Sequence, residues 1–229
     1  TDHLADRPEP FDVLEDGRAV LARWQAFAKT PEGQALASQP VVPVVQVLER
    51  TRTLVRPDGS TLELAHRIRL VQTKQGADAL GDVRPPEGAR LLVVRTLKAD
   101  GRVLEPERTE GKAELSCPEL NPGDAVETGW VTRSRALPSE GGYLTGVSFS
   151  SWGAPIFELE ASFEVPAGLD LEVTSFGGAP TPTRSAVADG GTRLAWKLGP
   201  RPAIPREPMA VSARSFFPFA DLRLTRAAG

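Results

Sequence analysis

The alternation of apolar and polar residues predicts a chain made mainly of β-strands. Residues 157 to 165 and 62 to 70 both alternate with a period of two, and Glu63, Arg67 and Arg69 fall on the polar side of the second segment. This period is typical of a strand with one buried face. The apolar positions of the two segments are Phe157, Leu159, Ala161, Phe163 and Val165, and Leu62, Leu64, His66, Ile68 and Leu70.

Helical periodicity is confined to the N-terminal part of the chain. Asp16 suits an N-cap, and the residues after it up to position 28 carry one apolar stripe at helical spacing. A second short helical turn is expected after Pro31, although Gly33 weakens it. The stripe consists of Val20, Leu21, Trp24, Phe27 and Ala28.

Frequent turn signals divide the rest of the chain into short strands. Glycine and proline each number 21 in 229 residues, and Pro57-Asp58-Gly59 is a strong turn between two strand patterns. Roughly twelve to fourteen strands with such spacing predict an all-β, large antiparallel β-sandwich with a short N-terminal helical segment. A parallel sheet is excluded on this reasoning, because crossover helices are missing. We therefore expect residues 1–40 to form a linker and an amphipathic helix, and residues 41–229 to form the β-sandwich domain.

Charge and hydropathy exclude several classes of partner. The formal net charge is -3, whereas a nucleic-acid-binding domain usually has a basic excess. No run of 18 apolar residues occurs, so no membrane insertion is expected. A single cysteine and two histidines are too few for a zinc site of the usual kind. We expect no nucleic acid, no metal and no cofactor.

Candidate catalytic residues are few. Cys117 is the one possible thiol nucleophile, and His66 is its candidate base within the domain. Cys117 lies on a predicted short strand, residues 114 to 117, before a turn, which favours a buried, inert thiol, and the apolar register of His66 favours a core or interface histidine. Three glutamates beside the apolar positions of residues 157 to 165 are expected on a solvent face, namely Glu158, Glu160 and Glu164. The sequence therefore predicts no catalytic set.

Two groups of aromatic residues are candidates for binding. Residues 130 to 157 are rich in aromatic side chains, which either stack on a sugar ring or a peptide, or simply pack the sandwich. The second group, near the C-terminal end, is either a docking patch for an adjacent domain or partner, or the last core strand. The binding candidates are Trp130, Tyr143, Phe149 and Trp152, and the docking candidates are Phe216, Phe217 and Phe219.

The turn motifs, taken in order, resemble a known family. They resemble the domain of unknown function 3857, which precedes transglutaminase-like domains in bacterial proteins. The resemblance covers about residues 45 to 215 and implies an all-β sandwich with no agreed catalytic or binding residues. It also implies a bacterial periplasmic or envelope setting. The matching motifs are Pro57-Asp58-Gly59-Ser60, His66-Arg67-Ile68, Lys74-Gln75-Gly76, Ala99-Asp100-Gly101-Arg102, Asn121-Pro122-Gly123-Asp124 and Val165-Pro166-Ala167-Gly168.

Three functions remain open from the sequence. The first is a non-catalytic accessory or protein-interaction domain of a larger bacterial protein or envelope complex, with a protein partner or adjacent domain. The second is a carbohydrate- or peptide-binding module that uses the aromatic stretch 130–157. The third, which has the least support, is an enzyme with an unfamiliar site at Cys117.

Overall fold

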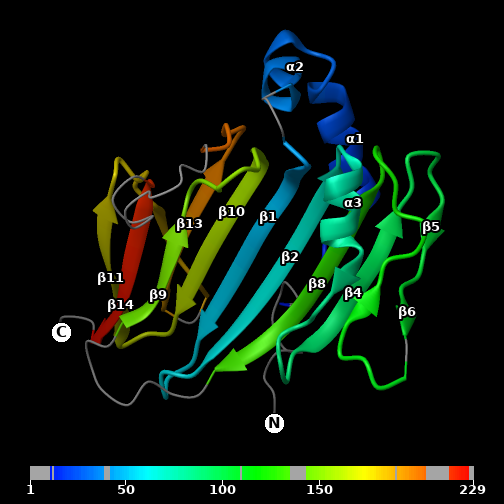
Figure 1. Cartoon of the computed structure of the whole chain (residues 1–229). Coiled ribbons are helices and arrows are strands. Elements are labelled where there is room, and N and C mark those ends of the chain that lie inside the picture. The colour runs from blue at the N-terminus through cyan, green and yellow to red at the C-terminus, as the bar shows by residue number, and fades with distance from the viewer. Residues whose placement is uncertain are drawn as a thin grey trace, which may run out of the picture.

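The computed structural model describes residues 11, 13–38, 42–108, 110–134, 143–188, 190–204 and 217–226. Within these residues three sheets form a mainly β architecture with three short helices (Figure 1). No helix of the described part is long and apolar enough to cross a membrane. The helices are α1 (Gly17–Phe27), α2 (Pro31–Ala37) and α3 (Lys74–Leu80).

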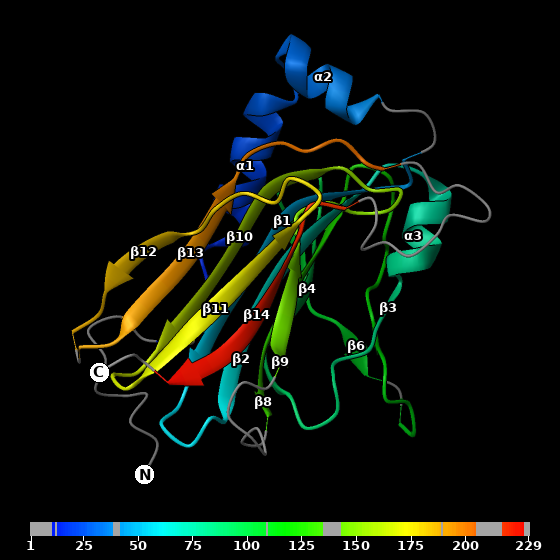
Figure 2. The same cartoon turned by 90° about the vertical axis from the view of Figure 1, so that its left-hand side faces the viewer.

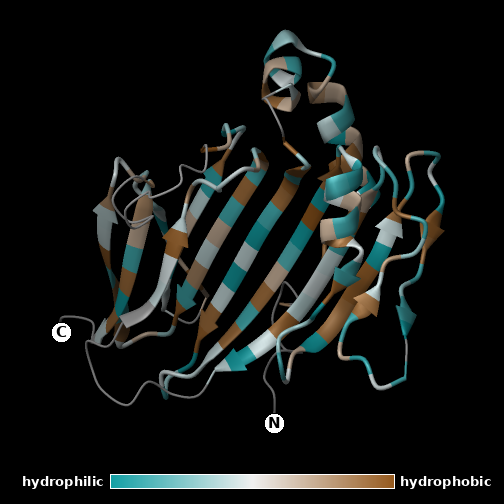
Figure 3. Cartoon of the chain, viewed as in Figure 1, coloured by the Kyte–Doolittle hydropathy of each residue, from teal (hydrophilic) through white to brown (hydrophobic). Residues whose placement is uncertain are grey.

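The largest sheet has eight strands in the order β12-β13-β10-β1-β2-β8-β4-β5. Its long central strands give the alternating bands of apolar and polar residues that Figure 3 shows. The bounds are β12 (Thr183–Ala186), β13 (Thr192–Leu198), β10 (Ile156–Val165), β1 (Val44–Val55), β2 (Thr61–Val71), β8 (Ala125–Ser134), β4 (Arg90–Leu97) and β5 (Val103–Leu104).

One strand pair departs from the antiparallel arrangement expected from the sequence. β1 and β10 run parallel, with Thr51 opposite Ala161. The chain between them contains eight strands and α3, so their connection passes through other layers and needs no crossover helix. The mainly β sandwich is confirmed, and its large sheet is mixed.

A three-stranded sheet covers β13 and β10 on one face of the large sheet (Figure 2). Its order is β11-β14-β9, with bounds β11 (Leu169–Phe176), β14 (Phe219–Arg226) and β9 (Tyr143–Ser148). Leu171 and Leu222 from this layer meet Phe163 and Trp196 from the large sheet in one buried cluster. This half of the molecule is therefore a two-layer sandwich.

The opposite end of the same face is covered by α3 and a second small sheet. That sheet has the order β3-β7-β6, with bounds β3 (Asp82–Val83), β7 (Leu115–Ser116) and β6 (Glu107–Arg108). Leu80 and Leu115 pack there against Val94 and Val126 of the large sheet. The two covers leave the middle of this face, on β1, β2 and β8, between them.

Helix α1 covers part of the other face of the large sheet, and α2 lies beyond the ends of the strands (Figures 1 and 2). Asp16 is the N-cap of α1 and accepts a hydrogen bond from the backbone N–H of Arg18 at 3.2 Å, as expected from the sequence. Val20, Leu21 and Trp24 are buried against the sheet. Trp24 meets Phe157 edge-on, with ring centroids 5.4 Å apart.

Two further expectations need correction. Phe157 was expected on the same face as the apolar residues that follow it, but it packs in the cluster under α1, whereas Phe163 belongs to the sandwich cluster. The glutamates of β10 were expected on a solvent face. Instead they are half-buried and form ion pairs, because α1 and β1 bring arginines beside them: Glu158 with Arg23, Glu160 with Arg50 and Glu164 with Arg52.

Candidate functional site

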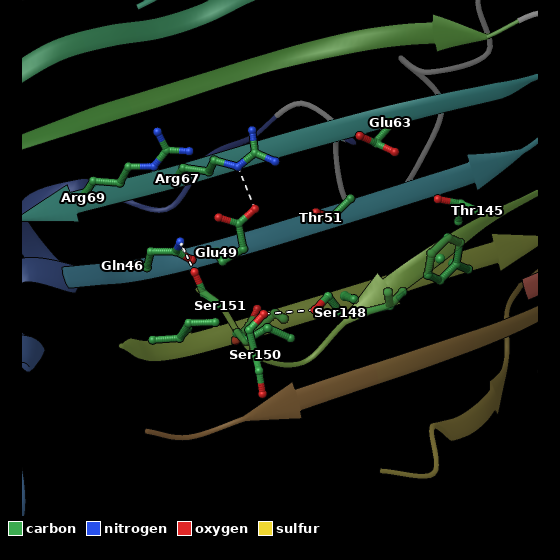
Figure 4. A pocket seen from close by; sticks show the side chains of 17 residues that line it. Gln46, Glu49, Thr51, Glu63, Arg67, Arg69, Thr145, Ser148, Ser150 and Ser151 are labelled. Carbon is green, nitrogen blue, oxygen red and sulfur yellow. Dashed lines mark hydrogen bonds and ion pairs between the residues drawn. The ribbon is translucent and has the colours of Figure 1, made fainter. Parts of the chain in front are cut away.

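A cavity of about 500 Å³ lies in the uncovered middle of the large sheet, between β1, β2 and β10 on one side and β9 on the other. We call it the central cavity (Figure 4). Its walls carry many polar side chains from both layers. The polar residues whose side chains face it are Gln46, Glu49, Thr51, Glu63, Arg67 and Arg69 from the large sheet, and Thr145, Ser148, Ser150 and Ser151 from β9 and the loop after it.

The polar floor of the central cavity follows from the alternation along β2. Leu62, Leu64 and Ile68 point to the face that α1 and the N-terminal residues cover. Successive side chains of a strand point to opposite faces. Glu63, Arg67 and Arg69 therefore point to the other face, where they line the cavity.

The face of the large sheet that carries the cavity changes from apolar to polar at the edge of the β11-β14-β9 sheet. On β10 and β13, below β9 and β14, it presents Phe163, Leu194 and Trp196, all buried. One or two strands further, on β1 and β2, the residues that share this face are Glu49 and Arg67, paired in register. The surface beyond β9 is thus built for polar contacts and not for a hydrophobic cover.

Arg67 is held in place on the cavity floor. Its Nε donates to Oε1 of Glu49 at 2.6 Å, and its guanidinium lies 5.6 Å from the centroid of the Trp130 ring. An ion pair and a cation–π contact together fix an arginine side chain more firmly than either contact alone. At one end of the cavity, Gln46 donates to the hydroxyl of Ser151 at 3.1 Å.

Arg69 and Glu63 are the exceptions on the floor. Both are half-buried, and within the described part of the chain the side chain of neither residue makes a hydrogen bond or ion pair. Burial lowers the pKa of Arg69, with Glu49 opposing, and burial raises the pKa of Glu63, with Arg67 opposing. A partly desolvated charge that lacks a hydrogen-bonded or ion-paired side chain costs free energy, so each of these two groups favours a ligand of opposite charge.

A second cavity of about 470 Å³ adjoins the first. Arg67 and Arg69 line both, so the two cavities adjoin at these arginines between the two covers of the sheet. We call the two together the trough. Trp130 lines this second part, as do Asp82 and Arg84 at the edge of the β3-β7-β6 sheet. The trough therefore contains cationic, anionic and aromatic side chains.

The aromatic candidates from the sequence are dispersed and mostly packed. Phe149 is 1% exposed and lies against Trp196 in the core, which is the packing alternative of the sequence analysis. Trp152 packs against Phe217, with ring centroids 4.7 Å apart. Trp130 is the one that the structure places at the trough. The backbone of Tyr143 begins β9, and its side chain lies outside the described part.

The aromatic docking candidates near the C-terminal end are also buried or half-buried where the structure describes them. Phe217 is 5% exposed and Phe219 is half-buried, while Phe216 lies outside the described residues. In the described part, the exposed large apolar side chains are Val13 and Phe176. Phe176 is paired with Phe219 across β11 and β14. The exposed aromatic surface near the C-terminal candidates therefore lies where β11 ends and β14 begins.

Cys117 and His66 lie on opposite faces of the large sheet. Cys117 belongs to the buried cluster under α3, and burial raises the pKa of its thiol. His66 points to the α1 face, where its Nε2 lies 2.9 Å from Oε1 of Glu127. The sheet separates the two side chains, so they cannot act as a nucleophile and its base. In the described ranges, no three metal-ligating side chains are grouped to hold an ion.

Sequence reasoning missed the central site. It assigned the charged residues of β2 to an exposed strand face, which is the usual place for charge. The available signal was that Glu63, Arg67 and Arg69 alternate with strongly apolar residues along one long predicted strand. Whether such a face meets solvent or a second layer depends on β9, which follows β2 by some seventy positions in the sequence.

Comparison with known proteins gives a fold likeness and no family. No family model matches the chain, and no curated protein matches it. A solved structure from Parabacteroides distasonis ATCC 8503, named "putative protease", is similar with a TM-score of 0.66 and 16% sequence identity. The match covers 79% of this chain and 40% of that one. At this identity the likeness shows the fold alone, and this chain spans less than half of the other protein's length.

Proposed function

We propose that this chain is a non-catalytic protein-interaction domain of a larger bacterial protein. The observation that carries the proposal is the trough, an open polar surface between two layers with charged groups of both signs that have no partner in the described part of the chain. Such groups lower the stability of the domain on its own. They are understandable as the recognition groups of a binding surface.

Two further observations support this function. The structural neighbour named "putative protease" contains the fold in a chain of which this domain covers 40%, so the fold occurs beside other polypeptide. The separation of Cys117 from His66 also supports it, because it speaks against a thiol site built on this pair. We include in this proposal the resemblance to the domain of unknown function 3857. On that resemblance, the domain would position a neighbouring enzyme domain of the same protein.

In-cell cross-linking of the longest natural protein that contains this chain tests the proposal. We expect cross-links from the trough to one defined protein or adjacent domain, and loss of those cross-links in an Arg69→Glu, Glu63→Lys double variant. A matched Glu172→Lys variant, altered at an exposed position of β11, should keep them. Two results would contradict the proposal. One is substrate turnover by the isolated chain that Cys117→Ala abolishes, and the other is a set of cross-links that the trough variants leave unchanged.

A further inference from the structure

We infer that the central cavity binds an extended peptide segment of a partner protein, which adds as a fourth strand to the free edge of β9. The inference rests on the proposed interaction function and names the kind of partner. It combines three observations: an unpaired strand edge, a polar floor beside that edge, and two unpartnered charges of opposite sign at a fixed separation along the floor.

The free edge belongs to β9. In its sheet β9 pairs with β14 on one side, and on the other side no strand of the described chain follows it. Thr145 and Ser148 of β9 line the central cavity, so the open edge borders the cavity. Figure 1 shows β9 as the strand of its sheet nearest β1 and β2. An open edge presents backbone N–H and C=O groups that an extended peptide can satisfy.

The floor beside this edge determines the character of the peptide. A strand added to β9 would lie about 4.8 Å from it and would face β1 and β2 across the space between the layers. Every second side chain of the peptide would point at Glu49, Thr51 and Arg67. These residues offer hydrogen bonds and charge, so the inward side chains of the peptide should be polar.

The spacing of the two unpartnered charges determines its pattern. Glu63 and Arg69 both lie on β2 and both line the cavity. Six residue steps along a strand correspond to roughly 20 Å. A peptide that extends along the trough therefore meets Arg69 with an acidic side chain and Glu63 with a basic one, about six residues apart.

The order of the two charges reports the direction of the added strand. Figure 1 shows the arrows of β2 and β9 pointing the same way, so Arg69 lies toward the end of β9 and Glu63 toward its start. A peptide antiparallel to β9 would carry the acidic residue N-terminal to the basic residue. A parallel peptide would carry them in the reverse order.

Selection from a displayed library of random peptides, each about nine residues long and thus able to span the trough, tests the inference on the whole chain. We expect enriched peptides with one acidic and one basic residue separated by about six positions in one fixed order. Hydrogen exchange should show slower exchange of the amides of residues 143–148 when an enriched peptide is bound. Enriched peptides without this charge pattern, or protection confined to other strands, would overturn the inference.

Charge-reversal variants make the test specific. Arg69→Glu should weaken binding of an enriched peptide about tenfold or more, through loss of a charge-assisted contact. A peptide with its acidic residue changed to lysine should recover affinity for that variant. Arg193→Glu on the opposite face should change binding little. Thermal denaturation of each variant separates misfolding from loss of contact, and the recovery with the swapped peptide cannot come from a misfolded chain.

The outcomes also separate this inference from the proposed function. If peptides bind but Arg69→Glu and Glu63→Lys leave their affinity unchanged, the strand-addition site is wrong while an interaction role stands. If no peptide is enriched and the cross-links of the longer protein still require Arg69 and Glu63, the trough binds a folded surface and the strand-addition inference is again wrong. If those cross-links are absent as well, the proposed function itself fails.

Discussion

Nε2 of His66 lies 2.9 Å from Oε1 of Glu127, and both side chains are almost completely buried under the start of α1. The second carboxylate oxygen of Glu127 accepts from Nε of Arg95 at 2.6 Å, and Arg95 also lies 3.7 Å from Asp16, the N-cap of the helix. Gly17 sits directly on the carboxylate of Glu127. This cluster, which we call the helix anchor, joins three strands to the N-terminal helix.

Gly17→Ala should loosen the helix anchor. A Cβ atom at this position would collide with the carboxylate of Glu127, and such overpacking typically costs about 1–3 kcal/mol. Urea denaturation measures the change in the free energy of unfolding. Gly199→Ala is the control, because an added Cβ meets no atom within 4 Å there. Equal stability of the two variants would contradict the packing seen at Gly17.

Glu127→Ala should destabilise the domain more strongly than Gly17→Ala. It would leave Arg95 and the buried ring of His66 without the carboxylate that both contact, and removing one partner of a buried charge pair costs about 3–5 kcal/mol. Chemical denaturation with circular dichroism measures the loss. Glu172→Ala, at an exposed position of β11, should stay within about 0.5 kcal/mol of wild type. A similar small effect at Glu127 would refute the anchor.

Asp124→Asn should lower stability at neutral pH and lose its effect in acid. Burial alone would raise the pKa of Asp124, but Lys98 and two backbone N–H groups outweigh it and hold the pKa below its ordinary value. Because the folded pKa lies below the unfolded one, this stabilisation is complete above about pH 4 and disappears as the pH falls through the folded pKa.

Urea denaturation of both proteins at several pH values measures this dependence. We expect a difference of about 2 kcal/mol at pH 7 that narrows steadily below pH 4. A difference that stays constant across this range would mean that the asparagine acts through packing and not through the lost ion pair with Lys98.

Glu63→Gln should raise stability at neutral pH. Burial raises the pKa of Glu63 in the folded state, so its stability contribution is complete below the unfolded pKa of about 4.3 and is lost as the pH rises through the folded pKa. At pH 7 the folded domain therefore carries the cost of a partly desolvated carboxylate, which glutamine removes. The midpoint of urea denaturation should rise, whereas Glu172→Gln should leave it unchanged. A fall at Glu63 would mean that its charge has a partner in solution.

Cys117 should resist thiol reagents in the folded protein. The side chain is 6% exposed, and burial raises the pKa of the thiol, so little of the reactive thiolate is present or accessible at pH 8. We expect reaction with an aromatic disulfide reagent to be at least about a hundredfold slower than in concentrated urea. Because the chain has one cysteine, the urea-unfolded protein supplies the full signal. Rapid labelling of native protein would show an open site at this position.

Local patterns predicted the features that depend on neighbouring residues in the chain. The N-cap at Asp16 and the buried stripe of α1 are as expected, because a helix end and its apolar face are set within four residues. Gly59 adopts a φ of 79°, as the turn at Pro57-Asp58-Gly59 requires. His66 lies on the apolar face of β2 because side chains of a strand alternate whatever lies above them.

The sequence by itself determined which residues share a face, and the tertiary structure decided what each face meets. Glu63, Arg67 and Arg69 had to lie together on one side of β2, but only the placement of β9 over the neighbouring strands made that side the wall of a cavity. Likewise, Glu158 forms its ion pair with Arg23 only because α1 packs against the sheet. Backbone alternation is a local property of the chain, whereas the packing of layers depends on contacts between residues far apart in sequence, whose small free energies count only in sum.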